Sequence, residues 1–237
     1  MYKHILKITG ILFLGALGAL FFNVSLLPYF LASTYFENFQ FVKDFKQGKI
    51  VVNKTDQIYI QENVSIENAI ERVQKSIVSI QSPALGLKSG LIVTSDGLVA
   101  TLANVIPSSG NFNVFVDGEP VNFKVVKMDY KNNLALLKIE KNNLPTVGFA
   151  YSDKIKLGQK VFLVASISIK QDNWFASQGI IREINVNSIK TDIVEKSIVS
   201  GGPLFNSAGE LMGLNFIDSE GRVSAIPINK IQKLLGL

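Results

Sequence analysis

The chain has 237 residues, of which 47% are hydrophobic, and it carries 24 Lys and Arg against 19 Asp and Glu. It contains no cysteine, which excludes disulfides, thiolate catalysis and cysteine-based metal sites. Residues 61–237 hold 18 basic and 16 acidic side chains and no basic run, so the composition argues against a nucleic-acid partner.

An apolar segment near the N-terminus raises the hydrophobic content. No charge interrupts the 20 positions Ile8–Leu27, and a helix of that length spans about 30 Å, the thickness of the hydrocarbon layer. The rival interpretation is a cleaved signal peptide, but its apolar core is shorter, and this run resumes to Leu31. We therefore predict an uncleaved signal-anchor. Lys3 and Lys7 precede it, which predicts a single-pass protein of the cytoplasmic membrane with its N-terminus inside.

This anchor defines the expected domain organisation. A cytoplasmic tail covers residues 1–7, the transmembrane helix covers 8–31 and a stalk covers 32–63. A single extracytoplasmic domain is expected over residues 64–237.

Short elements follow one another along this domain. The apolar spacing of residues 65–75 predicts an amphipathic helix with Ser65 as its N-cap. Ten short runs rich in Val, Ile, Leu and Phe then predict strands, at 76–80, 90–95, 98–102, 112–116, 122–128, 134–139, 160–165, 178–184, 211–217 and 222–228. Many short strands separated by turn signals indicate an all-β barrel or sandwich. Residues 229–237 are expected to form a short terminal helix.

Several sequence blocks add a more specific resemblance. "SGLIVTSDGLVATLANVI", "NLALLK", "LGQKVFLVA", "IVSGGPL" and "SAIPINKI" occur in this order, and together they resemble the trypsin-like domain of the HtrA/Deg serine proteases over roughly residues 65–235. The resemblance implies a chymotrypsin/trypsin-like double β-barrel, two six-stranded barrels with the active site in the cleft between them. Many members continue into a PDZ domain, and none is expected here because the sequence stops at Leu237.

The resemblance also assigns the three positions of a catalytic triad. The block "TLANV" places Asn104 where the family has its histidine, "NLALLK" places Asn133 where it has its aspartate, and "IVSGGPL" keeps the serine as Ser200. An asparagine amide cannot accept the proton of a serine hydroxyl, and a neutral side chain cannot stabilise an imidazolium. The single histidine of the chain, His4, is expected on the other side of the membrane.

The oxyanion hole is predicted to be impaired as well. It uses the backbone N–H groups of Ser200 and of the residue two positions before, which here is Ile198 rather than the glycine of the family. A β-branched residue resists the backbone conformations that glycine allows. Lys190 or Lys196 could replace the missing base in a Ser–Lys arrangement, but nothing in the sequence places either amine beside Ser200.

The leading hypothesis is therefore a trypsin-like serine protease homologue that has lost catalysis, a pseudoprotease. It would bind a protein or peptide ligand in the barrel cleft or regulate a partner, alone or as a homo- or hetero-oligomer, without cofactor or metal. The alternatives are an active HtrA/Deg-type endopeptidase with unorthodox chemistry and a structural subunit of a membrane assembly.

Overall fold

The computed structural model describes residues 65–169 and 173–237, together with residues 10, 13–15, 17–26, 28–29, 33 and 35. The chain divides into two compact units, Met1–Gln57 and Ile58–Leu237. The predicted tail and almost all of the predicted stalk lie outside the described residues.

The first unit is helical wherever the described residues of the apolar segment carry an assignment. It includes a π-helical turn, η1 (Phe22–Leu26), and exposed apolar side chains such as Phe13, Leu14 and Val24. Within the part of the chain that the structure describes, no helix combines the length and apolarity that crossing a membrane requires. The predicted transmembrane helix over residues 8–31 falls partly on residues outside the description.

The second unit begins with the predicted amphipathic helix. It covers residues 65–73 and continues into the 3-10 turn η3 (Gln74–Ser76). Ile66, Ala69 and Val73 are buried on its inner face, as the apolar spacing predicted. Ser65 is the first described residue of this helix, and its hydroxyl donates to the carbonyl oxygen of Ser207 at 3.4 Å. Its N-cap role stays a prediction, because the residues before it lie outside the described ones.

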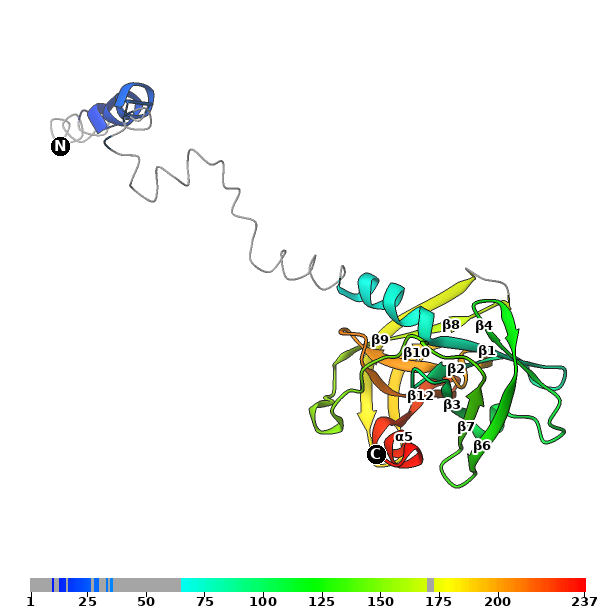
Figure 1. The fold of residues 1–237 in the computed structure, drawn as a ribbon. Helices are drawn as coiled ribbons and strands as arrows, with labels where there is room; N and C mark the ends of the chain where they lie inside the picture. Colours follow the sequence, from blue (N-terminus) through cyan, green and yellow to red (C-terminus); the bar gives the residue numbers. More distant parts are fainter. Residues whose placement is uncertain are drawn as a thin grey trace. The chain divides into compact units, whose positions relative to one another are not determined.

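A seven-stranded antiparallel sheet forms the N-terminal half of the second unit (Figure 1). Its spatial order is β5-β4-β1-β2-β3-β7-β6. The strands are β1 (Ile77–Ser82), β2 (Gly86–Ile92), β3 (Leu98–Leu102), β4 (Asn113–Val116), β5 (Glu119–Val121), β6 (Phe123–Asp129) and β7 (Leu134–Ile139).

A closed six-stranded barrel forms the C-terminal half, in the order β10-β13-β12-β11-β8-β9. The strands are β8 (Lys160–Ser166), β9 (Trp174–Ile184), β10 (Ile189–Val194), β11 (Pro203–Asn206), β12 (Leu211–Ile217) and β13 (Arg222–Pro227). The terminal helix α5 (Ile228–Leu235) follows β13 directly and ends at Gly236, whose φ of 86° gives the left-handed cap typical of helix ends.

All ten predicted strands are present, but the expectation of two closed barrels is only half right. The C-terminal barrel closes, whereas no ladder joins β5 to β6 in the described N-terminal sheet. The two strands follow each other with only Asn122 between them, and Pro120 in β5 has no N–H to donate to a ladder. The sheet is therefore a half-barrel. We call the break in its strand pairing at Asn122, between β5 and β6, the seam.

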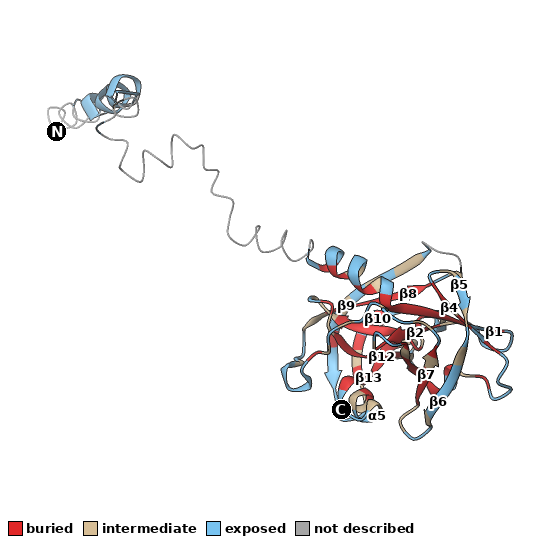
Figure 2. Cartoon of the chain, viewed as in Figure 1, coloured by how far each residue is buried: buried red, intermediate tan, exposed pale blue. Residues whose placement is uncertain are grey.

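The apolar faces of both halves pack into continuous cores. One core joins the helix of residues 65–73, the N-terminal sheet and α5 to the outer face of the barrel, where Phe162 and Phe205 contact each other at 5.3 Å between ring centroids. A second core fills the barrel itself around Leu163, Leu204 and Met212. In Figure 2 the buried residues follow the strands through the centre of the domain, while the exposed ones gather at the turns. Two cores that share strands β8, β11 and β12 hold the halves together as one unit.

The turn between β2 and β3 is expected to tolerate only glycine at position 97. Gly97 has φ +99°, and a Cβ there would lie 2.6 Å from the carbonyl oxygen of Ile139. Gly221 is the matched control, because its φ is +76° and nothing lies within 4 Å of its added Cβ. We expect Gly97→Ala to lower the free energy of unfolding by about 2–4 kcal/mol and Gly221→Ala by about 1 kcal/mol. Urea denaturation followed by the fluorescence of Trp174 measures both, and equal losses would contradict the steric explanation.

Candidate active site

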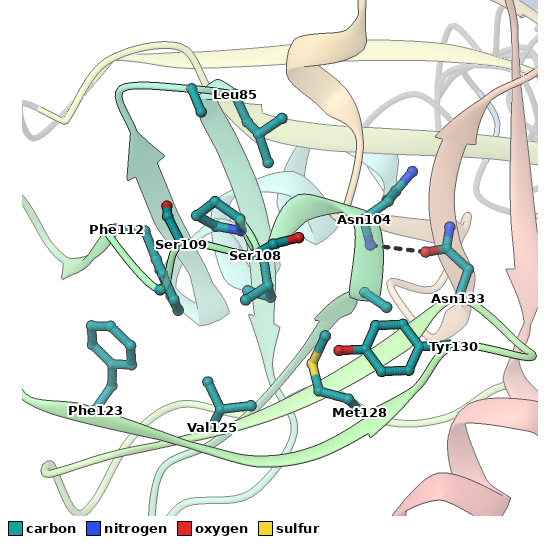
Figure 3. A pocket seen from close by; sticks show the side chains of 15 residues that line it. Leu85, Asn104, Ser108, Ser109, Phe112, Phe123, Val125, Met128, Tyr130 and Asn133 are labelled. Atoms are coloured by element: carbon teal, nitrogen blue, oxygen red, sulfur yellow. Dashed lines mark hydrogen bonds between the residues drawn. The ribbon is translucent and has the colours of Figure 1, made fainter.

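Asn104 and Asn133 meet at the edge of the N-terminal half-barrel. Asn104 lies in the 3-10 turn η4 (Ala103–Val105), directly after β3, and Asn133 ends the turn that leads into β7. The backbone N–H of Asn104 donates to Oδ1 of Asn133 at 2.9 Å, and the N–H of Ala103 donates to the Asn133 carbonyl oxygen at 3.1 Å. Asn133 has φ +55°, which asparagine adopts more readily than most residues. The two residues assigned to the histidine and aspartate positions are therefore neighbours (Figure 3).

Ser200 lies in a tight loop between β10 and β11. The loop contains the 3-10 turn η6 (Ser197–Val199), and Ser200 follows it in extended conformation, with φ −65° and ψ 138°. Val199 is fully buried and Ile198 packs against the barrel core. The hydroxyl of Ser200 makes no hydrogen bond within the described residues.

Backbone hydrogen bonds fix the loop between the two halves of the domain. The N–H of Ser89 in β2 donates to the Ser200 carbonyl oxygen at 3.3 Å, and the N–H of Gly201 donates to Asn215 in β12 at 2.8 Å. Gly201 has φ +83°, and an added Cβ would collide with the Ser89 carbonyl oxygen and Thr101 Oγ1 and lie 3.2 Å from Val105.

This contact brings the serine loop beside the asparagine segment. Thr101 and Val105, which Gly201 approaches, lie on either side of Asn104 in the sequence. The structure therefore gathers all three positions that the sequence assigned to a triad. It does not join Ser200 to Asn104 or Asn133 by a hydrogen bond among the residues described.

The backbone N–H groups of the serine loop turn toward the loop itself. The N–H of Ser200 donates to the carbonyl oxygen of Ser197 at 3.1 Å, and the N–H of Val199 donates to Lys196 at 3.2 Å. An oxyanion hole requires the N–H of the serine to point at the substrate oxygen. Ile198 is not among the described residues with positive φ. In this conformation the N–H of Ser200 donates to the Ser197 carbonyl oxygen and not to a substrate oxygen.

Lys88 is the residue at this site that sequence reasoning missed. Its Nζ donates to the carbonyl oxygen of Ser197 at 2.9 Å and lies 3.1 Å from the Ser197 hydroxyl. The same carbonyl therefore accepts from both the ammonium and the Ser200 N–H. Partial burial lowers the pKa of Lys88 below its ordinary value, because desolvation disfavours the charged form. Lys88 lies more than a hundred positions before Ser197, so no local motif could have linked them.

The two lysines considered as replacement bases are placed differently. Lys190 Nζ forms an ion pair with Glu183 at 2.9 Å, and the hydrogen bond to that carboxylate raises the pKa of Lys190. A raised pKa keeps this amine protonated at neutral pH, so it has no lone pair with which to accept the proton of a serine. Lys196 is exposed just before η6 and has no hydrogen bond or ion pair from its side chain within the described region. Neither lysine contacts Ser200.

A pocket of about 860 Å³ opens beside Asn104. Figure 3 shows Asn104 and Asn133 at one end and the rings of Phe112 and Phe123 at the other. The lining residues are Ala84, Leu85, Ala103, Asn104, Ile106, Pro107, Ser108, Ser109, Gly110, Phe112, Phe123, Val125, Met128, Tyr130 and Asn133. None of them is charged at neutral pH. The pocket therefore suits an uncharged, largely apolar group held by a few asparagine and serine side chains.

Comparison with known proteins relates this chain to a family of peptidases. The model of the trypsin-like peptidase domain matches residues 88–214. A probable periplasmic serine endoprotease DegP-like of Halomonas elongata is 36% identical over 158 residues, which cover 60% of this chain and 33% of that protein. The putative serine protease HhoB of Synechocystis is 31% identical over 165 residues, covering 63% of this chain and 39% of its own. This chain spans about a third of the length of such curated relatives.

A solved structure agrees with the sequence matches. The crystal structure of the serine endoprotease from Yersinia pestis superposes with a TM-score of 0.64 at 27% identity, covering 72% of this chain and 65% of that one. The described strands thus form a trypsin-like fold with one closed barrel and one half-barrel. The chain belongs to the trypsin-like peptidase domain family, in which its relatives are the HtrA and DegP serine proteases.

Proposed function

We propose that this protein is a non-catalytic member of the family that binds protein or peptide segments outside the cytoplasmic membrane. One observation carries the proposal: no described residue accepts a hydrogen bond from the Ser200 hydroxyl at this site. Asn104 occupies the position of the base, and its backbone N–H is held by the Asn133 amide oxygen. An amide cannot take the proton of a hydroxyl at neutral pH, so the serine stays a weak nucleophile.

The serine loop supports the same conclusion independently. The N–H of Ser200 is directed at Ser197, and Lys88 in β2 binds the same carbonyl oxygen, which anchors the loop in this conformation. Opening the oxyanion hole would break the Ser200–Ser197 hydrogen bond. It would also move Val199, which is fully buried. Loss of a base and loss of an oxyanion donor each lower turnover by orders of magnitude.

The ligand class follows from the pocket beside Asn104. A neutral, largely apolar lining favours uncharged side chains of an extended or unfolded polypeptide over charged small molecules. Such binding needs shape and burial but no triad. A protein of this kind holds peptide segments, or presents them to an active protease, without cutting them.

The proposed location joins two observations. The relatives include proteins named as periplasmic endoproteases, which supports an extracytoplasmic domain. The uncharged run Ile8–Leu27 supports a single membrane anchor with the N-terminus inside.

An active endopeptidase is the second candidate, favoured by the retained Ser200 and by the names of the relatives. A fluorophosphonate probe and unfolded casein separate the two candidates. We expect the full-length chain to label no faster than Ser200→Ala, because its hydroxyl lacks a base, and to bind casein without cleaving it. Casein retention on immobilised protein and gel analysis of products measure the two properties. Labelling and cleavage that both disappear in Ser200→Ala would overturn the proposal.

Restoring the triad alone should not restore the protease. We expect Asn104→His with Asn133→Asp to cleave casein very slowly, because the N–H groups of the serine loop still do not point at the position of the substrate oxygen. Adding Ile198→Gly should then raise the rate by about 10²-fold, the typical worth of an oxyanion donor. The control is the same triple variant with Ser200→Ala. Efficient cleavage by the double variant would show that the oxyanion segment is intact.

Removing Lys88 should loosen the serine loop. We expect Lys88→Met to speed hydrogen exchange of the Ser200 amide by about tenfold, since Ser197, whose carbonyl oxygen accepts from that amide, loses its anchor to β2. Lys138→Met is the matched control, because Lys138 likewise binds the carbonyl and side chain of one residue, Asp96, in a different turn. Exchange mass spectrometry of the loop peptide measures both variants. Equal exchange of this peptide in the two variants would show that Lys88 does not stabilise the serine loop.

A further inference from the structure

A groove rich in lysine lies between the β6–β7 turn and α5 and borders the neutral pocket, with which it shares Met128, Tyr130 and Asn133. Two adjoining hollows of about 550 and 460 Å³ form it, and both are lined by Lys131, Asn132 and Lys230. Lys127 and Lys233 line the larger hollow and Asn187 the smaller one. Figure 1 shows α5 beside the lower ends of β6 and β7, and Lys127 in β6 bonds to Leu234 in α5.

Four lysines face one carboxylate across this groove. The carboxylate belongs to Asp129, which is already engaged: Oδ1 accepts the Asn132 N–H at 3.0 Å and Oδ2 accepts the Asn132 side-chain amide at 2.7 Å. None of the four lysines forms an ion pair in the part of the chain that the structure describes. Residues 61–237 are almost balanced in charge, with 18 basic and 16 acidic side chains. The groove therefore concentrates positive charge that the rest of the domain does not share.

The lysines that make hydrogen bonds use neutral oxygen acceptors. Lys127 Nζ donates to the Leu234 carbonyl oxygen at 3.1 Å, and Lys230 Nζ donates to Asn187 Oδ1 at 2.6 Å. An ammonium has three donors, so each keeps two for a ligand while its position is fixed by the third.

Helix stability explains only part of this cluster. Lys233 lies in the last turn of α5, and the ammonium of Lys127 reaches the same end of the helix from β6. A cation at the C-terminal end of a helix interacts favourably with the helix dipole. Lys230 lies in the first turn of α5, which has no acidic residue and where a cation opposes the dipole. Lys131, in the β6–β7 turn, gains nothing from the helix. A role in binding accounts for Lys131 and Lys230, the two lysines that both hollows share.

We propose that this groove binds an anion that carries more than one phosphate group. Ammonium groups act as point charges that suit tetrahedral phosphates, whereas bidentate carboxylate recognition uses the planar fork of arginine. The lining contains lysines and asparagines but no arginine. A phosphomonoester carries about 1.5–2 negative charges at neutral pH, so the net charge of four lysines and one carboxylate is balanced by two phosphates and not by one. The hollows lie in the size range of small-ligand sites.

The test uses the full-length chain in a non-ionic detergent, titrated by calorimetry at low salt with inorganic tripolyphosphate. We expect a Kd below about 1 mM for the native chain. Lys131→Gln with Lys230→Gln should weaken binding about tenfold or more, whereas Lys131→Arg with Lys230→Arg should keep it within about threefold. The control, Lys75→Gln with Lys156→Gln, removes the same charge from exposed lysines outside the groove and should change the affinity less than about twofold.

Two further ligands identify the chemistry and its source. Binding of 1,3-bisphosphoglycerol, a headgroup fragment with two phosphates, with the same lysine dependence would support the site and point to lipid headgroups, and binding of tripolyphosphate alone would support it and point to soluble phosphate chains. Hexaglutamate that binds as tightly as tripolyphosphate would overturn the phosphate assignment. Equal losses in the groove and control variants, or no binding of either phosphate, would overturn the site.

Discussion

The position of Gly201 between the two halves of the domain is the constraint on which the rest of the site depends. Its backbone N–H binds β12, the carbonyl oxygen of Ser200 before it binds β2, and its missing Cβ leaves room for Ser89 and Thr101. These contacts join the half-barrel to the closed barrel at one loop. They give a structural reason for the sequence "SGGPL" to persist: the loop joins the two halves whether or not Ser200 reacts.

Under the proposed function, the same loop keeps the shape of a protease scaffold in a chain that does not catalyse. The parts that hold the loop in place are backbone hydrogen bonds and close packing, which do not depend on a histidine or an aspartate. The catalytic parts are side chains at Asn104 and Asn133 and the orientation of single N–H groups. Because the two sets of interactions are separate, the proposed loss of catalysis is compatible with the trypsin-like superposition.

The fold was largely predictable from short-range patterns, and the exceptions have physical causes. All ten runs of apolar residues are strands, and residues 65–73 are helical as their period indicated. The three strands that the pattern missed, β5, β10 and β11, are short or contain Pro, Lys, Asp or Asn, so their composition resembles that of turns. The closure of only one barrel depends on pairing between distant strands, which local periodicity does not report.

The residues of the candidate site also divide into those that local sequence patterns predict and those that only the fold brings together. Asn104, Asn133 and Ser200 could be assigned because each lies in a block whose residue order is distinctive. Lys88 and the lysine groove could not, because their partners come from segments far apart in the chain and only the folded sheet brings them together. Side chains with long flexible stems act at a distance that sequence spacing does not reveal.

The seam at Asn122 has a consequence for the neutral pocket. Phe112 precedes β4 and Phe123 opens β6, and their rings lie 4.5 Å apart between centroids, just beyond the Val114–Val121 pair that ends the β4–β5 ladder. At this end of the pocket the ladder is therefore continued by an aromatic contact worth about 0.5–1.5 kcal/mol. Replacing either ring would therefore change the lining at this end of the pocket without removing a hydrogen bond of the strand ladder.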